Sequence, residues 1–153
     1  PAEKEAEREK IIKVIEDNIK ASEEQDFAPM VRTLADEVTF YGTDSSEIIK
    51  TFPEYKKAIE KQWEEYDQMD YGDMFDIYLE IDEQGRTAFI IYGIPLDIVK
   101  DGKKAHLYLR VARFLVKIDK KWVIRRGIVG VVSDGINYED IEPETDTTTT
   151  KEE

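Results

Sequence analysis

The spacing of hydrophobic positions changes once along this chain, from a helical period to a strand period. Up to about residue 70, apolar side chains recur every three or four residues, which predicts helices over 3–21, 26–34 and 53–69. A short alternating segment predicts one strand at 37–41, followed by a turn at 42–44 and a short helical turn. We therefore expect a first half dominated by helices.

After residue 72 apolar and polar positions alternate, and this pattern continues to residue 132. It predicts four strands, over 75–81, 86–96, 105–118 and 121–132. The second of these carries consecutive apolar residues at 89–91, so both of its faces are apolar, as in a central strand that is covered on both sides. Helices first and an antiparallel meander afterwards predict an α+β fold rather than a wound parallel sheet.

Length and composition fit one folded domain followed by an acidic tail. The 153 residues include 41% hydrophobic side chains, enough for a sizeable core. Between 136 and 153, seven acidic residues are opposed by one lysine, and apolar side chains are few. We expect a single domain over 1–138 and a disordered acidic tail over 139–153, because such a segment cannot offset the entropy of ordering.

Composition also narrows the chemistry. The chain has no cysteine and a single histidine, which excludes disulfides and thiol chemistry and argues against zinc, so we expect no metal and no cofactor. A net charge of −13 disfavours nucleic acids and anionic membranes as partners. No run of 18 apolar residues occurs, and the first twenty residues are rich in charge. We expect no membrane span, no secretory signal and a cytoplasmic location.

Two segments carry a family resemblance. The first is Phe-Tyr-Gly-Thr-Asp at 40–44 with Glu47 three residues on, and the second is the closing hairpin at 113–124. Together with the element order, they resemble the SnoaL-like branch of the nuclear transport factor 2-like superfamily over about residues 5–135. The resemblance implies a cone-shaped, cystatin-like fold in which N-terminal helices pack on a strongly bent antiparallel sheet. It also implies an apolar pocket at the open end and a homodimer through the outer sheet face.

Arg113 is the main candidate for a binding residue. It interrupts the alternation of Leu109, Val111 and Leu115 on a face otherwise fit for burial, and a buried guanidinium needs an anionic partner. The resemblance implies a pocket arginine at this position, as in the association domain of calmodulin-dependent kinase. Its partner is either an internal carboxylate or a carboxylate or enolate ligand. A one-residue shift in the last hairpin would turn Arg126 inward instead.

The remaining candidates are aromatic or titratable. The aromatic side chains that we expect to line the pocket are Tyr41, Trp63, Tyr66 and Tyr92. Asp44 follows the first strand and His106 begins a later one, and these two are weak candidates for a catalytic base, because an exposed histidine at a strand edge is the commoner case. Enzymes of the family often place a histidine where Ile128 stands here, which argues against the family's usual chemistry.

Three functions stay open. The first is the binding of a small apolar molecule with an anionic or carbonyl group, oriented by Arg113. The second is an isomerase or cyclase that moves a proton next to a carbonyl, which requires a base inside the pocket. The third is a dimeric assembly or adaptor domain whose pocket is filled. A proton acceptor open to the cavity would favour the enzyme. A cavity whose only charged group is Arg113 would favour the binding protein, and a cavity filled by side chains would favour the adaptor.

Overall fold

The computed structural model describes residues 2–134 and 138–141, so the predicted tail over 139–153 lies almost entirely outside the described residues. The helices are α1 (Ala2–Glu24), α2 (Phe27–Arg32) and α3 (Phe52–Glu65). The strands are β1 (Leu34–Tyr41), β2 (Ile48–Ile49), β3 (Gln68–Tyr71), β4 (Phe75–Ile81), β5 (Thr87–Lys100), β6 (Lys103–Ile118) and β7 (Lys121–Val131). The predicted order of helices before a strand meander is therefore present.

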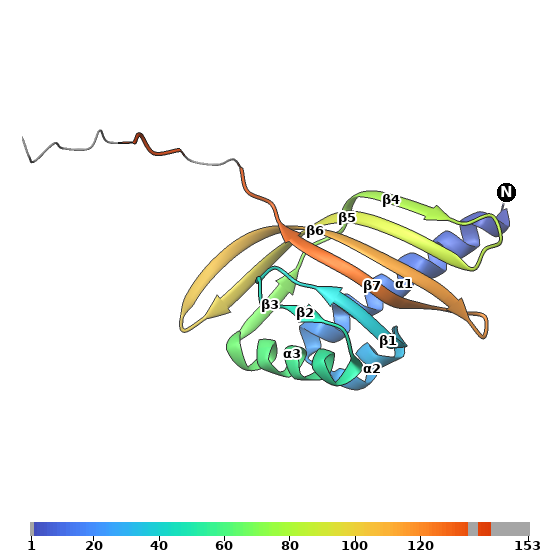
Figure 1. Cartoon of the computed structure of the whole chain (residues 1–153), viewed down its shortest axis with the longest axis horizontal. Coiled ribbons are helices and arrows are strands. Elements are labelled where there is room, and N and C mark those ends of the chain that lie inside the picture. Colours follow the sequence, from blue (N-terminus) through green and yellow to red (C-terminus); the bar gives the residue numbers. More distant parts are fainter. Residues whose placement is uncertain (1, 135–137, 142–153) are drawn as a thin grey trace, which may run out of the picture.

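The strands form one bent sheet, which curves over the helices (Figure 1). Its order is β2-β1-β7-β6-β5-β3, and β4 also pairs with β5, on the stretch of that edge that β3 leaves free. The pair of β1 with β7 is parallel, whereas every other pair is antiparallel. The sheet is thus mixed, which corrects the prediction of a wholly antiparallel one. The long connection from β1 to β7 permits this parallel pairing.

The core lies between α1 and the concave side of the sheet. Ile11 and Ile15 of α1 are one helical turn apart, and both are fully buried. They pack in one cluster with Ile90 of β5, Leu115 of β6 and Ile124 of β7, which are equally inaccessible. This cluster fixes α1 against the three central strands.

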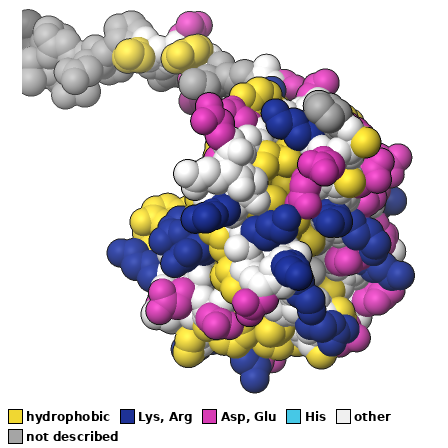
Figure 2. Space-filling view, turned by 90° about the vertical axis from the view of Figure 1, so that its right-hand side faces the viewer, with side chains coloured by type: hydrophobic (Ala, Val, Ile, Leu, Met, Phe, Trp, Pro, Cys, Tyr) yellow, Lys and Arg dark blue, Asp and Glu magenta, His cyan; other side chains and the backbone are white. Residues whose placement is uncertain are grey.

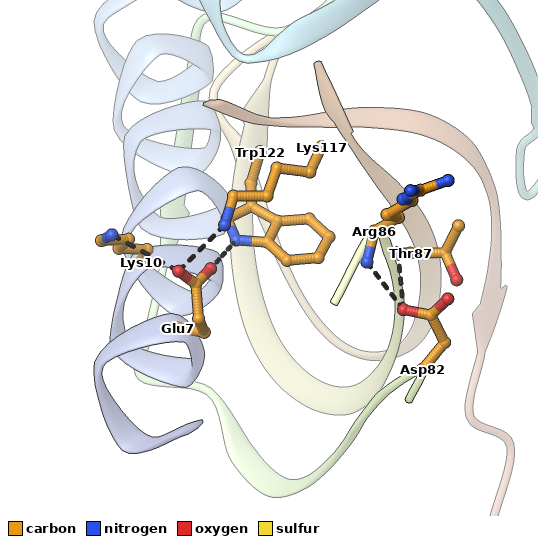
Figure 3. A network of polar contacts seen from close by, with 7 residues as sticks. All are labelled: Glu7, Lys10, Asp82, Arg86, Thr87, Lys117 and Trp122. Atoms are coloured by element: carbon orange, nitrogen blue, oxygen red, sulfur yellow. Dashed lines mark hydrogen bonds and ion pairs between the residues drawn. The ribbon is translucent and has the colours of Figure 1, made fainter. Parts of the chain in front are cut away.

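A polar contact attaches the beginning of α1 to the β6–β7 hairpin (Figure 3). The carboxylate of Glu7 accepts hydrogen bonds from Nε1 of Trp122 and, at 3.0 Å, from Nζ of Lys117. These two donors lower the pKa of Glu7 below its usual value. The Trp122 ring itself is buried, so a helix start rich in charged side chains is held at a defined place on the sheet.

The β4–β5 turn is closed by an aspartate (Figure 3). The Asp82 carboxylate accepts from the backbone N–H groups of Arg86, at 2.7 Å, and Thr87, at 3.1 Å. These bonds lower the pKa of Asp82, because they favour its charged form. The turn ends at Gly85, whose φ of +71° is in the left-handed region that glycine adopts without strain.

Several boundaries differ from the sequence prediction: β1 begins at Leu34 instead of 37, β5 continues to Lys100 instead of 96, and two larger differences concern the cavity. The helix predicted over 53–69 ends at Glu65, and the residues after it form β3 on the edge of β5. Met69 would be buried in the predicted helix and is buried in the observed strand, because its side chain faces inward from β3 as well. The helical turn expected after Asp44 is instead a loop leading into β2, whose Ile49 pairs with Phe40.

Among the described residues, no helix has the length and hydropathy needed to cross a membrane. The surface at the end that carries the β6–β7 hairpin is charged, with Lys and Arg side chains spread across its middle and Asp and Glu around them (Figure 2). Charge is thus mixed on this face, despite the net charge of −13.

Candidate functional site

A cavity of about 600 Å³ lies between α3 and the concave side of the sheet. Tyr92 of β5 and Arg113 of β6 are the innermost residues of these two strands that line it. The next inward-facing residues, Ile90 and Leu115, are fully buried and belong to the core. The cavity therefore has a closed end at Tyr92 and Arg113 and extends from there along the strands.

The strand wall beyond the closed end is apolar. It consists of Ile94, Leu96 and Ile98 of β5, Leu107, Leu109 and Val111 of β6, and Val129 and Val131 of β7. From Arg113 to Leu107 the wall runs along six residues of β6, or about 20 Å of extended strand. A ligand of mainly apolar character fits such a wall.

Arg113 has no acidic partner in the described part of the chain. Its Nη1 lies 3.4 Å from the carbonyl oxygen of Ala112, and its guanidinium carbon lies 5.1 Å from the centre of the Phe40 ring. Within residues 2–134 and 138–141, no carboxylate forms an ion pair with it. A half-buried cation without a counter-charge is costly, which makes the closed end attractive to an anion.

The register of the last hairpin determines which arginine faces the cavity. Phe114 pairs with Arg126, but Leu115 pairs with Ile124, so Arg125 is the extra residue of a β-bulge. The bulge places Gly127 opposite Arg113 and leaves Arg126 exposed and off the cavity lining. The alternative in which Arg126 replaces Arg113 in the cavity is thereby excluded.

Three tyrosines line the cavity within electrostatic reach of the guanidinium. Tyr55 of α3, Tyr71 of β3 and Tyr92 of β5 all line the cavity, and the charge of Arg113 acts on each of them. Burial nevertheless dominates: it raises the pKa of Tyr55 to about 12 and also raises the pKa of Tyr71 and Tyr92. These phenols remain protonated near neutral pH, so they act as hydrogen-bond donors and not as bases.

Asp44 lines the cavity at its solvent-exposed rim. One carboxylate oxygen accepts from the backbone N–H of Ser46 at 2.8 Å and from its hydroxyl at 2.7 Å. These bonds lower the pKa of Asp44, which weakens it as a proton acceptor. Another lining carboxylate, that of Glu47, lies against Gly42, where a Cβ atom would come within 2.3 Å of its Oε2. Neither group reaches the closed end that Tyr92 and Arg113 form.

His106 does not line the cavity. It is exposed on β6, directly across from Asp97 of β5, and its Nδ1 contacts the Asp97 carboxylate. The ring also meets Tyr108 edge-on, with ring centres 5.1 Å apart. The structure therefore offers His106 no access to a ligand in the cavity.

Of the four aromatic residues expected on the wall, Tyr66 and Tyr92 line the cavity. Tyr41 only borders its rim, because its side chain is 42% exposed and lies across from the exposed Ile128. Trp63 does not line the cavity: it packs edge-on against Phe27, with ring centres 6.4 Å apart. Its Nε1 is buried without a hydrogen-bond partner among the described residues. Trp63 thus belongs to the packing between α3 and α2 and not to the cavity.

The sequence reasoning did not propose Tyr55 and Tyr71 as site residues. Tyr55 lies in the helix predicted over 53–69, and its burial there does not by itself reveal the cavity beside it. Tyr71 belongs to β3, the strand that was taken for the end of that helix. In the described residues, no cluster of three or more side chains suited to hold a metal ion occurs.

Helices packed on a bent sheet around one deep cavity define a class of small pocket proteins. The chain belongs to the SnoaL-like domain family, whose model matches residues 11–127. This confirms the predicted family, and solved structures confirm the nuclear transport factor 2-like, cystatin-like fold. A search of curated proteins finds no match.

Three similar structures illustrate the range of the fold. A protein of unknown function from Pseudomonas putida KT2440, described as like nuclear transport factor 2, has 14% identity and a TM-score of 0.72, covering 92% of this chain and 98% of its own. A hexachlorocyclohexane dehydrochlorinase from Novosphingobium barchaimii LL02 has 10% identity and a TM-score of 0.74, covering 90% and 97%. The calcium/calmodulin-dependent protein kinase II hub from S. rosetta has 16% identity and a TM-score of 0.69, covering 81% and 95%.

Proposed function

We propose that this protein binds a small, mainly apolar molecule in its cavity and that Arg113 orients an anionic or carbonyl group of that molecule. The observation that carries the proposal is the unpaired guanidinium at the closed end of an apolar cavity of about 600 Å³. A half-buried guanidinium without an internal counter-charge forms stronger hydrogen bonds with a ligand oxygen than with water confined beside apolar side chains.

The two alternatives have less support. An isomerase or cyclase needs a proton acceptor beside the ligand, and Asp44 is held at the rim by Ser46 with a lowered pKa. The dehydrochlorinase among the similar structures is only 10% identical, so its activity does not transfer to this chain. An adaptor with a filled pocket is at odds with the open cavity.

Native mass spectrometry of the purified protein tests the proposal directly, because it detects a small molecule that co-purifies. The informative variant is Arg113→Met, which removes the charge and keeps an apolar side chain of similar length. Arg110→Met is the matched control, since Arg110 is exposed on the same strand and does not line the cavity. We expect loss of the adduct in the first variant only. A more stable Arg113→Met protein with unchanged ligand uptake would show that the arginine has no binding role.

We also propose a homodimer through the outer face of the sheet. Side chains from five adjacent strands form an apolar row across this face: Tyr78, Ile91, Ala112, Ile128 and Tyr41. Four of the five are exposed large hydrophobic residues, which is unusual for the centre of a sheet in contact with water. A second copy that covers this row would remove the exposed apolar surface.

The neighbouring row supports a self-complementary arrangement. It runs Glu80, Phe89, Phe114, Arg126 across β4 to β7, with opposite charges at its two ends. A two-fold axis along the strands between β5 and β6 would place each Glu80 over the partner's Arg126, and each Phe89 over the partner's Phe114.

Sedimentation of charge-reversed variants tests this pairing. Arg126→Glu should weaken the dimer, and adding Glu80→Arg should restore it, because the two opposite charges exchange places. A wild-type protein that sediments as a monomer at high concentration would refute the dimer.

A further inference from the structure

We infer that the closed end of the cavity is a carboxylate site, which Arg113 forms together with the phenols of Tyr55 and Tyr92, with Tyr71 further along the wall, and for which Gly127 positions the guanidinium. This inference rests on the proposed binding function and narrows it, since a neutral carbonyl compound would satisfy that function equally well.

The inventory of donors at the closed end favours a carboxylate. Arg113 offers a fork of N–H groups without an acceptor, apart from the carbonyl of Ala112 at 3.4 Å. The three tyrosines stay protonated, and two of them already meet a polar side chain, Tyr55 that of Asn18 and Tyr71 that of Ser22. Tyr92 adds its hydroxyl group to the donors of Arg113. The carboxylates that line the cavity belong to the loop after β1 and to α3, so none of them competes with a ligand at the closed end. A carboxylate accepts several such bonds at once, whereas a neutral carbonyl leaves the guanidinium charge uncompensated.

The order of polar and apolar surface predicts how the ligand lies. Donors occupy the closed end, and the strand wall from Val111 to Leu107 is apolar toward the mouth. A carboxylic acid with an apolar body would therefore enter head first, with its charged group buried and its body along β5, β6 and β7. The depth of about 20 Å along β6 accommodates an extended chain.

The absence of a side chain at Gly127 leaves space for the side chain of Arg113. The two face each other across β6 and β7. A Cβ atom on Gly127 would lie 2.3 Å from Nη1 and 2.8 Å from Cδ of Arg113, and also 2.8 Å from the backbone carbonyl oxygen of Ala112, all closer than real Cβ atoms come. The backbone of Gly127 is not in the left-handed region, so its conformation does not require glycine. The space it leaves, for the Arg113 side chain and for the Ala112 carbonyl that Arg113 contacts, is the physical reason for a glycine here, and Gly127 acts as a positioning residue.

The test compares two probes of equal length, octanoate and octanamide, by isothermal titration of the full chain. We expect octanoate to bind at least about tenfold more tightly, the effect of one charge-assisted hydrogen bond. Arg113→Met should abolish this preference while octanamide binding persists. Equal affinity for the two probes would overturn the carboxylate assignment and leave the binding function intact. If neither probe binds and no adduct is found in the purified protein, the proposed function fails as well.

Gly127→Ala tests the positioning role, with Gly130→Ala as its control. Gly130 lies on the same strand, has no positive φ and has open space where a Cβ atom would be. We expect Gly127→Ala to reduce octanoate affinity roughly tenfold or more, with octanamide affinity unchanged, and Gly130→Ala to change neither. In the Arg113→Met background, Gly127→Ala should no longer change the ratio of the two probe affinities, because that ratio depends on the guanidinium, whereas the contact with the Ala112 carbonyl affects both probes alike. Full octanoate affinity in Gly127→Ala would overturn this role, and thermal melting of each variant shows that it is folded.

Discussion

The buried phenol of Tyr55 makes a prediction about stability at high pH. Its pKa is raised from 10.0 to about 12, mainly because burial disfavours the phenolate, and the residue is only 6% exposed. Between these two values the unfolded chain has lost this proton while the folded chain keeps it. The free energy of unfolding therefore falls as pH rises above 10, with a limiting slope of about 1.4 kcal/mol per pH unit.

Tyr55→Phe removes the titrating group and keeps the ring. By the same linkage relation, the stability difference between wild type and variant should be constant below about pH 9 and should shift in favour of the variant by about 1.4 kcal/mol at pH 11. The complete shift, beyond both pKa values, amounts to about 2.7 kcal/mol for a difference of two units. Urea unfolding followed by circular dichroism at each pH measures both curves.

Tyr108→Phe is the matched control, because it removes a phenol that is 49% exposed on the outer face. Its stability should run parallel to that of the wild type. A Tyr55→Phe curve that stays parallel up to pH 11 would refute the argument. It would mean that water reaches the phenol in the folded protein and that the cavity is wetter at this point than its lining suggests.

Three further changes have defined outcomes. Glu7→Gln removes a charge that Trp122 and a lysine contact, so it should cost about 1 kcal/mol in urea unfolding, with the difference disappearing as pH falls through the lowered pKa of Glu7. Thr51→Ala removes the N-cap of α3 and should cost about 1 kcal/mol in thermal unfolding. Leu115→Ala should cost about 3 kcal/mol and open the core behind the cavity, and a loss below 1 kcal/mol would contradict the packing described.

The sequence predicts the architecture well because two strong periodicities mark it. One is the helical spacing of Ile11 and Ile15, and the other is the alternation along β4 to β7. Both arise because one face of the element is buried, so the order of apolar and polar residues in the sequence reveals them. The end of α3 was placed wrongly for the same reason. Met69 continues the helical series from Tyr55 and is also an inward position of β3, so burial alone does not distinguish the two.

The site is harder to predict, because it depends on what lies opposite each residue. Arg113 stands out in its strand as a charge among apolar positions, and this signal is local. Whether Arg126 or Gly127 lies opposite it depends on the bulge at Arg125, which the sequence does not mark. The role of Tyr71 requires the pairing of β3 with β5, and that of Gly127 requires the register of the last hairpin. Which residues lie opposite one another is decided by the pairing of segments that are distant along the chain, and this pairing cannot be predicted from the local pattern of a single sequence.

The parallel pairing of β1 with β7 has a consequence for biosynthesis. β1 is made early, yet its partner in the sheet ends at Val131, about ninety residues later along the chain. Until β7 has left the ribosome, the β1–β2 pair has no strand that joins it to the rest of the sheet, so Phe40 of β1 is not yet held against the guanidinium of Arg113. The cavity is thus completed last, and a nascent chain that stops short of Val131 exposes the apolar wall that the finished protein encloses.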